Sequence, residues 1–238
     1  MTTAIVSAMH EELAAVLALM PDERMQVVGG REFWLGHLRG QPVVAVLSRI
    51  GKVAAATTAT ALIERFGVRR IVFTGVAGGL APGVDVGHVV VADSFLQHDL
   101  DASPIFPKYQ VPLYGLDRFA ADPALGEQLA QAARSALPGV RLHRGLVVSG
   151  DRFVSTTGES RALQAALPQA LAVEMEGAAF AQVCHDYGVP FAAVRTISDR
   201  ADDAAHGDFT RFIREVASRY SGAIVEALLR PQPPHGAR

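Results

Sequence analysis

Short apolar runs alternate with segments whose apolar residues recur at helical spacing, and this alternation most limits what the chain can fold into. A strand-like run at residues 4–8 is followed by a helical pattern at 11–20, and the last third of the chain repeats the same order. Strands that alternate with helices predict a mostly parallel sheet covered on both faces. A hairpin at 32–47 adds antiparallel pairing, so we expect an α/β fold with a central mixed, twisted sheet flanked by helices.

The same periodicity and the glycine and proline positions place the other elements. The expected strands are 4–8, 32–38, 43–47, 70–74, 88–92, 142–149, 171–175 and 191–197. The expected helices are 11–20, 52–66, 123–136, 177–187 and 209–229. Neither a repeat nor a linker divides the pattern, so residues 1–230 should form one domain, with the proline-rich segment 231–238 as a flexible tail.

Charge and cysteine content exclude several classes of function. The net charge is −2 and the 22 Lys and Arg residues are scattered, so we expect no nucleic-acid partner. Cys184 is the only cysteine, which excludes an internal disulfide or a multi-cysteine metal site and indicates a small core residue. A signal-peptide pattern is missing and apolar stretches fall short of the roughly 18 residues of a membrane helix, so we expect a cytoplasmic protein without membrane association.

Chemically active residues gather directly after four of the expected strands. Ligands of α/β sheets bind beyond the carboxyl ends of the strands, so these groups should share one site. Glu174 and Glu176 interrupt an apolar strand, and their spacing places them on one face unless the strand ends between them. The four groups are Met9 with Glu11 and Glu12, the glycine-rich segment 75–79, Glu174 with Met175 and Glu176, and Ser198 with Asp199.

Each group also has a purely structural explanation. A position at the edge of the sheet could explain one of Glu174 and Glu176. Glu12 could favour the N-terminus of its helix through the helix dipole, and Ser198 with Asp199 could be a cap or turn. The glycines at 75–79 could form a tight turn, and they are no P-loop because the pattern G-x-x-x-x-G-K-[ST] is missing. The coincidence of four groups at one sheet edge favours a common site over four separate structural roles.

Six segments carry a resemblance to a known family. They are Ala8-Met9-His10-Glu11-Glu12, Ile50-Gly51-Lys52-Val53-Ala54-Ala55, Thr74-Gly75-Val76-Ala77-Gly78-Gly79-Leu80, Val148-Ser149-Gly150-Asp151-Arg152-Phe153, Val173-Glu174-Met175-Glu176 and Arg195-Thr196-Ile197-Ser198-Asp199. In this order and spacing the chain resembles the 5'-methylthioadenosine/S-adenosylhomocysteine nucleosidases of the purine nucleoside phosphorylase-like superfamily. The resemblance implies a hydrolase that cleaves the N-glycosidic bond of a nucleoside with water, and it requires neither a metal nor an organic cofactor.

The resemblance implies that three carboxylates carry the reaction. Glu12 would be the general base that activates water beneath the anomeric carbon, Glu176 would bind the ribose hydroxyls, and Asp199 would protonate N7 of the purine. An acid that donates near pH 7 needs a pKa well above the reference value of about 3.9, which burial can supply. A carboxylate near the ribose stabilises the positive charge of an oxocarbenium-like transition state.

Substrate-binding roles are implied in the same way. Arg195 would help to place the water, and Met175 would lie against the sugar. Phe153 would stack on the base, the backbone of Val154 would bond the edge of the base, and Phe209 would line the 5' side. The full expected set is Met9, Ile50, Val76, Ala77, Gly78, Phe153, Val154, Met175, Arg195, Ser198 and Phe209.

Two features depart from the relatives. Val76 stands where many of them have serine or threonine, which removes a hydroxyl group that could contact the sugar or the water. The loop at 98–115 also differs, which leaves the exact substrate open. A lone chain would expose this loop's apolar residues, which is typical of an interface or ligand groove. The resemblance implies a homodimer in which this loop helps to complete the partner's 5' pocket, and the apolar residues favour an interface independently of it. The alternative is a loop that folds back on its own subunit. The residues concerned are Ile105, Phe106, Tyr109, Val111, Leu113 and Tyr114.

Three other functions stay open. A phosphorylase of the same fold needs a phosphate site after the first strand, where this chain has carboxylates that repel phosphate. A hydrolase of another purine nucleoside, of the futalosine type, would use a similar frame. A nucleoside-binding sensor without catalysis fits poorly with the presence of Glu12, Glu176 and Asp199.

Overall fold

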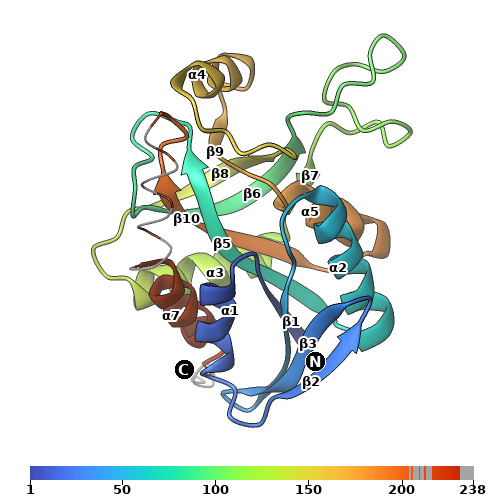
Figure 1. Ribbon diagram of the computed structural model, residues 1–238, viewed down its shortest axis with the longest axis vertical. Helices are drawn as coiled ribbons and strands as arrows, with labels where there is room; N and C mark the ends of the chain where they lie inside the picture. Colours follow the sequence, from blue (N-terminus) through green and yellow to red (C-terminus); the bar gives the residue numbers. More distant parts are fainter. Residues whose placement is uncertain (204, 206–208, 210–211, 213–215, 231–238) are drawn as a thin grey trace, which may run out of the picture.

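Ten strands form one sheet, and Figure 1 shows the helices arranged around it. The computed structural model describes residues 1–203, 205, 209, 212 and 216–230. The strands are β1 (Thr3–Ser7), β2 (Arg24–Val28), β3 (Arg31–Leu38), β4 (Gln41–Leu47), β5 (Arg70–Gly79), β6 (Val89–Gln97), β7 (Phe119–Ala120), β8 (Leu142–Ser149), β9 (Ala170–Glu174) and β10 (Phe191–Asp199). The helices named here are α1 (His10–Leu17), α2 (Lys52–Phe66), α3 (Pro123–Ala136), α4 (Thr157–Ala166), α5 (Gly177–Tyr187) and α7 (Ser218–Leu228).

Parallel and antiparallel pairings occur five times each. The strand order is β10-β6-β8-β9-β5-β1-β4-β3-β2, and an additional pairing of β5 with β10 closes β5, β10, β6, β8 and β9 into a ring. The expected mixed sheet is confirmed, whereas the prediction of a mostly parallel one is wrong. A parallel crossover needs a dozen or more residues, and β5 and β6 are joined by residues 80–88 alone. Accordingly, β6 runs antiparallel to β10, which is parallel to β5.

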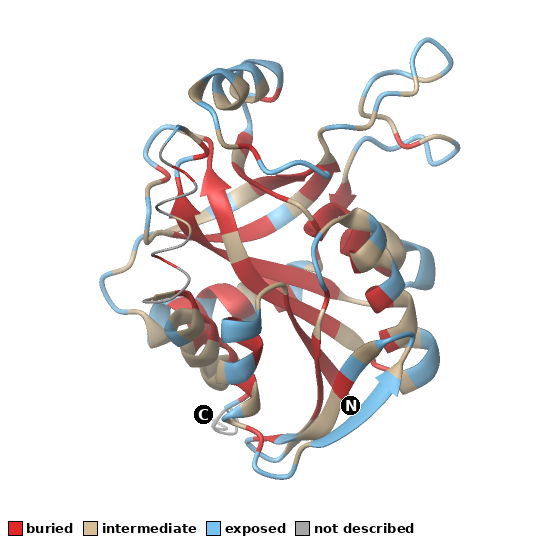
Figure 2. Cartoon of the chain, viewed as in Figure 1, coloured by how far each residue is buried: buried red, intermediate tan, exposed pale blue. Residues whose placement is uncertain are grey.

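Helices cover the sheet in two groups. On one side α2 packs on α5, and on the other α1 and α3 pack on α7. Phe73 of the sheet and Phe180 and Cys184 of α5 are buried in the first layer. Leu129 of α3 and Ile224 of α7 are buried in the second. Figure 2 shows the buried strands enclosed by helices whose outer faces are exposed. Burial of each large apolar side chain contributes about 1.5–3 kcal/mol to stability. The two layers therefore hold the strands in place, and with them the strand ends that form the site.

Some elements differ from the expected ones. β5 continues through Gly79 instead of ending at Thr74, because its glycines admit neighbouring groups: a Cβ on Gly79 would lie 2.4 Å from the carbonyl oxygen of Val84. β2, β7 and α4 were not expected, since β2 is largely exposed, β7 has two residues and α4 buries none of its residues. α7 covers the C-terminal part of the helix expected at 209–229. Several residues between 206 and 215 and the expected tail at 231–238 lie outside the described residues.

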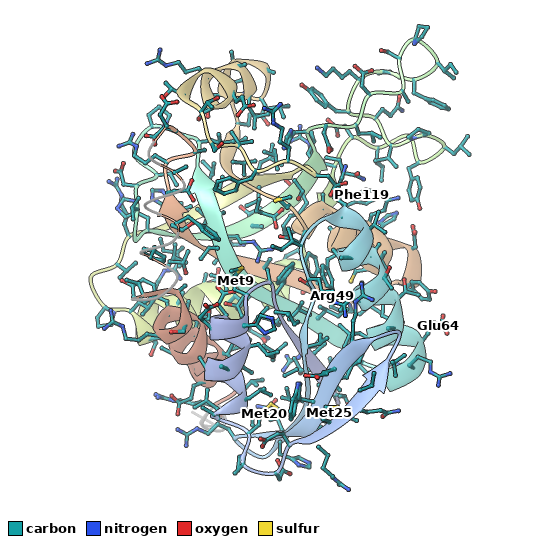
Figure 3. All side chains as sticks on the ribbon, viewed as in Figure 1. Met9, Met20, Met25, Arg49, Glu64 and Phe119 are labelled. Atoms are coloured by element: carbon teal, nitrogen blue, oxygen red, sulfur yellow. The ribbon has the colours of Figure 1, made fainter. Side chains whose placement is uncertain are left out.

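The loop at 98–115 projects from the body of the molecule near β7 and α5 (Figure 1). Ile105 and Leu113 are 83% and 92% exposed, whereas Val111 is buried. The ring of Tyr114 contacts that of Phe119 edge-on, with centroids 5.6 Å apart, and Figure 3 labels Phe119 at the base of the loop. Tyr109 is half-buried and packs against the buried cluster that contains Leu96 and Val148. The loop therefore packs partly on its own chain, and Ile105 and Leu113 are the apolar side chains that it leaves most exposed.

Candidate active site

A cavity of about 420 Å³ opens where β1, β9 and β10 end and where β5 carries its glycines. Its volume lies in the range of roughly 300–1,000 Å³ that is typical of small-molecule sites. The four groups expected at one sheet edge all contribute to this region. The lining residues are Ala8, Met9, Ile50, Val76, Ala77, Gly78, Phe153, Val173, Glu174, Met175, Glu176, Ser198, Asp199 and Phe209.

Most of the expected site residues line this cavity, and three do not. Glu12 and Arg195 are fully buried beside it, and Val154 lines a smaller adjoining cavity. Ile50 and Phe153 stand at the open side, 59% and 40% exposed. Glu174, which the sequence placed at this edge without a role, also lines the cavity, and the lining residues that were not predicted are Ala8 and Val173.

Glu174 and Arg195 form a buried ion pair beside the cavity. Arg195 Nη2 donates to Glu174 Oε2 at 2.8 Å, and the two side chains are 1% and 3% exposed. The guanidinium also lies 4.0 Å from the ring centroid of Phe73. Glu174 accepts further hydrogen bonds from the Gly177 amide, at 2.9 and 3.0 Å, and from the Ser149 hydroxyl. Several partners therefore satisfy each charge, which a buried pair requires in order to be retained.

Glu12 lies in the first turn of α1 and is completely buried. Ser221 of α7 donates to its Oε1 at 3.3 Å, and Thr74 of β5 donates to Ser221 at 2.8 Å. Among the described residues, its Oε2 has no hydrogen-bond partner. Burial raises the pKa of Glu12 to about 8, although the charge of Arg195 opposes this rise. The carboxylate can therefore gain or lose a proton near neutral pH.

The absence of a side chain at Gly75 leaves space between Glu12 and Arg195. A Cβ at this position would lie 3.4 Å from Arg195 Nη1 and 3.9 Å from Glu12 Oε2. The space is thus bordered by one cation and by the unpartnered oxygen of one carboxyl group. Polar surroundings of this kind suit a small polar molecule.

Glu176 stands at the N-cap of α5, just after β9 ends at Glu174. The amide of Gly51 donates to its Oε1 at 2.8 Å. Burial and the neighbouring charge of Glu174 raise the pKa of Glu176 to about 7. Because the strand ends between the two acids, they take different partners: Glu174 binds Arg195, and Glu176 binds the loop before α2.

A polar cluster of Lys52, Asp99 and Asp151 holds that loop in place. The Lys52 amide donates to Asp151 Oδ1 at 2.7 Å, and Lys52 Nζ donates to Asp99 Oδ1 at 2.5 Å. The Asp151 amide donates to Asp99 Oδ2 at 2.9 Å. The cluster joins the start of α2 to the segments that follow β6 and β8, and it thereby fixes Gly51 against Glu176.

Asp199, the last residue of β10, is 1% exposed. Ser198 Oγ donates to its Oδ2 and the Ala201 amide donates to its Oδ1, both at 2.8 Å. A Cβ on Gly78 would lie 2.9 Å from Asp199 Oδ1, so β5 needs glycine there to approach the carboxylate. Both oxygens are therefore held in fixed directions at the cavity wall.

The remaining wall is apolar and aromatic. Phe153 and Phe209 meet edge-on with ring centroids 5.7 Å apart, and both line the cavity. Met9 and Val76 pack in the same apolar cluster as Phe209. Figure 3 labels Met9 at the end of α1 that faces the sheet. Such walls favour a flat, mostly apolar ligand with a few polar groups.

Sequence reasoning gave no role to Glu174, Ser149 or Ser221. The sequence did contain a signal for Glu174, since a charged residue in an apolar strand is buried only when it is paired. Ser149 and Ser221 gave no signal of their own, since a serine at a strand end or on a helix is common. Their partners become visible only when β8, β9 and α7 are brought together.

Comparison with known proteins agrees with this geometry. The sequence profile of the phosphorylase superfamily matches residues 2–230. A 5'-methylthioadenosine/S-adenosylhomocysteine nucleosidase from Geobacillus thermodenitrificans (strain NG80-2) is 38% identical over 231 residues, which cover 96% of each chain. The chain belongs to the 5'-methylthioadenosine/S-adenosylhomocysteine nucleosidase family. The expected family and fold class are thereby confirmed.

Solved structures of this nucleosidase family have the same fold. The enzyme from Neisseria meningitidis in complex with methylthio-immucillin-A is 36% identical, with a TM-score of 0.91 over 96% of this chain and 98% of that chain. The futalosine hydrolase of Helicobacter pylori strain 26695 is 32% identical, with a TM-score of 0.89 over 96% of this chain and 97% of that chain. The nucleosidase frame therefore occurs in relatives with different substrate names.

None of the described helices is both long and apolar enough to cross a membrane. Within the same part of the chain, no group of three or more His, Cys, Asp and Glu side chains is arranged to hold a metal ion.

Proposed function

We propose that this protein hydrolyses the N-glycosidic bond of 5'-methylthioadenosine, S-adenosylhomocysteine or both, and releases adenine and the corresponding thioribose. The relative from Geobacillus thermodenitrificans is named for these two nucleosides. The observation that carries the proposal is the grouping of Glu12, Glu176 and Asp199 around one largely apolar cavity.

We assign the departure of the base to Asp199. A purine leaves poorly until N7 is protonated, and a positioned acid supplies that proton. Asp199 is buried and its carboxylate is oriented by Ser198. Phe153 would stack on the base, and the backbone of Val154 would bond the edge of the base.

The ribose is assigned to Glu176. As the bond between C1' and N9 breaks, the sugar becomes oxocarbenium-like, and a carboxylate stabilises charge that appears only in the transition state. Glu176 lines the cavity and is fixed by the Gly51 amide. Its carboxylate would also bind the ribose hydroxyls, with Met175 against the sugar.

The nucleophile is a water molecule in the space over Gly75. Its oxygen would bond to C1' while its proton passes to Glu12, and Arg195 would help to hold it. The position of this space between the two side chains supports the assignment. The other proposed substrate contacts come from Met9, Ile50, Val76, Ala77, Gly78 and Phe209.

A phosphate-free assay tests the reaction class. Methylthioadenosine should yield adenine and free methylthioribose in phosphate-free buffer, because Glu12 stands where a phosphorylase needs an anion site. Activity that depends on added phosphate, with a sugar 1-phosphate as product, would make the protein a phosphorylase instead.

Conservative variants test the three carboxylates. Glu12→Gln, Glu176→Gln and Asp199→Asn should each lower kcat about a hundredfold or more while the fold is kept, as is typical of acid-base and charge-stabilising groups. A folded Asp199→Asn variant with near-normal turnover would remove the leaving-group acid from the mechanism.

Futalosine-type nucleosides are the second candidate substrates. The similarity to a futalosine hydrolase favours their inclusion in the test. A panel of purine nucleosides, assayed for free base, measures which 5' substituent is preferred. A higher kcat/KM for futalosine than for methylthioadenosine would transfer the assignment to that class.

We propose further that the enzyme is a cytoplasmic homodimer in which the loop at 98–115 helps to complete the partner's 5' pocket. The exposure of Ile105, Leu113 and Val53 by 83%, 92% and 78% supports an interface on this side. A dimer interface would remove these apolar side chains from contact with solvent.

Mixed dimers test this arrangement. One chain carries Asp199→Asn and the other carries Phe106→Asp with Tyr109→Asp. If the loop serves the partner, both defects fall in one site of the heterodimer, so part of the activity returns on mixing. A wild-type enzyme that is monomeric and fully active at working concentration would contradict the proposal.

A further inference from the structure

Three elements far apart in the sequence meet at Glu12. Thr74 lies on β5, Ser221 on α7 and Glu12 on α1, and all three side chains are buried. Thr74 Oγ1 donates to Ser221 Oγ at 2.8 Å, and Ser221 Oγ donates to Glu12 Oε1 at 3.3 Å. A chain of hydroxyl groups therefore ends on one oxygen of this carboxyl group.

These hydrogen bonds run in one direction, from Thr74 through Ser221 to Glu12. A hydroxyl group carries one proton, so when Thr74 donates to Ser221, the proton of Ser221 is left for Glu12. The two oxygens of Glu12 thus differ. Oε1 is held by Ser221, while Oε2 lacks a hydrogen-bond partner within the described part of the chain and lies toward the space over Gly75.

We infer that Ser221, itself oriented by Thr74, is a positioning residue that holds Glu12 so that Oε2 is the atom that accepts the proton of the attacking water. This inference rests on the proposed function. In the step it describes, an O–H bond of water breaks and its proton goes to Oε2, the water oxygen bonds to C1', and the bond between C1' and N9 breaks with its electron pair on the base. Ser221 is buried and does not line the cavity, so it would act through Glu12.

Electrostatics explain why Glu12 needs such a donor. Burial disfavours the ionised form and raises the pKa of Glu12 to about 8. Arg195 on β10, the Met9 backbone and the Ser221 hydroxyl lower it, and Glu11 on the same helix raises it. A hydroxyl group that donates to a carboxylate stabilises the ionised form, which is the form that acts as a base.

Substitution at both hydroxyl groups tests the inference. In Ser221→Ala we expect kcat at pH 7 to fall about tenfold, KM to change less than about twofold, and the acid limb of the pH profile to move to higher pH. Thr74→Val should shift the limb in the same direction, and Thr74→Ser should restore the wild-type profile because it keeps the hydroxyl group. The double variant Ser221→Ala/Thr74→Val should be no worse than Ser221→Ala alone. The matched control is Ser218→Ala, one turn earlier on α7, which should leave the profile unchanged.

A second readout separates this inference from the proposed function. The ionisation of Glu12, followed by infrared difference spectroscopy against Glu12→Gln, should move to higher pH in Ser221→Ala whichever nucleoside is the substrate. If wild-type enzyme cleaves methylthioadenosine without phosphate but Ser221→Ala keeps the wild-type ionisation and pH profile, Ser221 is a packing residue and the inference is wrong. If the wild type does not cleave any purine nucleoside, the proposed function fails, and the infrared shift alone decides whether Ser221 controls Glu12. Should Ser221→Ala fail to fold, the Thr74→Val and Thr74→Ser pair decides the same question from β5.

Discussion

Replacement of Glu174 by glutamine would leave the cation of Arg195 buried without its counter-charge. The Arg195 side chain is 1% exposed and its Nη2 lies 2.8 Å from Glu174 Oε2. Removal of one partner of a buried pair costs about 3–5 kcal/mol, because the remaining charge is uncompensated. The new amide group also has one acceptor oxygen where the carboxylate has two, so the bonds from Ser149 and Gly177 compete for it. We expect Glu174→Gln to lower the melting temperature by about 6–20 °C for a chain of this size.

A double-mutant cycle measures this loss. The free energies of unfolding of wild type, Glu174→Gln, Arg195→Met and the double variant are compared by urea denaturation. The double variant should be more stable than the two single losses predict, because it removes both charges, and the coupling should be at least about 2 kcal/mol. The exposed pair of Arg118 and Asp117 is the matched control, and its loss should change stability by no more than about 1 kcal/mol. A Glu174→Gln variant that loses less than about 1 kcal/mol would refute the reasoning.

Three further predictions concern pH, water and the loop before α2. Because the pKa of Glu12 is raised from 4.5 to about 8, its contribution to stability is complete below pH 4.5 and is lost as the pH rises through about 8. Urea denaturation should therefore show that Glu12→Gln is more stable than wild type by up to ~5 kcal/mol at pH 9 and similar to it at pH 4. Equal pH dependence of the two proteins would contradict this prediction. Gly75→Ala should place a methyl group between Glu12 and Arg195 and lower kcat for adenine release at least about tenfold with little loss of stability, and unchanged kcat would show that the water lies elsewhere. Asp99→Asn should weaken the hold of Lys52 on the loop and raise KM more than it lowers kcat, whereas an unchanged KM in steady-state kinetics would mean that the loop is held without Asp99.

Much of the fold follows from hydrophobic periodicity. The strands that flank the site and the helices α1, α2, α3 and α5 are predicted from the sequence because they bury one stripe or both faces. β2 and α4 are not predicted, since both are largely exposed and carry little apolar pattern. The closed ring of strands is not predicted either, because pairing of β5 with both β9 and β10 depends on strand order, which local patterns do not encode.

The site was predictable in its outline and not in its contacts. Carboxylates placed after strands indicate a shared edge, and the structure brings Glu12, Glu176 and Asp199 together there, whereas their proposed roles come from the family resemblance. The partners of these acids could not be named, since Ser221 lies 209 residues from Glu12 along the chain and Gly51 lies 125 residues from Glu176. Such long-range hydrogen bonds depend on helix packing and loop conformation.

The charges around the cavity favour an uncharged substrate and water over phosphate. Arg195 is the one cation among the buried residues that the structure describes, and it is already paired with Glu174. Burial raises the pKa values of Glu12 and Glu176 to about 8 and about 7, so both are partly protonated near neutral pH before the reaction begins. A phosphate anion would meet carboxylates and no unpaired buried cation within the described residues, whereas a nucleoside develops positive charge only in the transition state, where ionised carboxylates stabilise it. The same electrostatics that make the site costly to fold at high pH therefore suit it to hydrolysis of a neutral nucleoside.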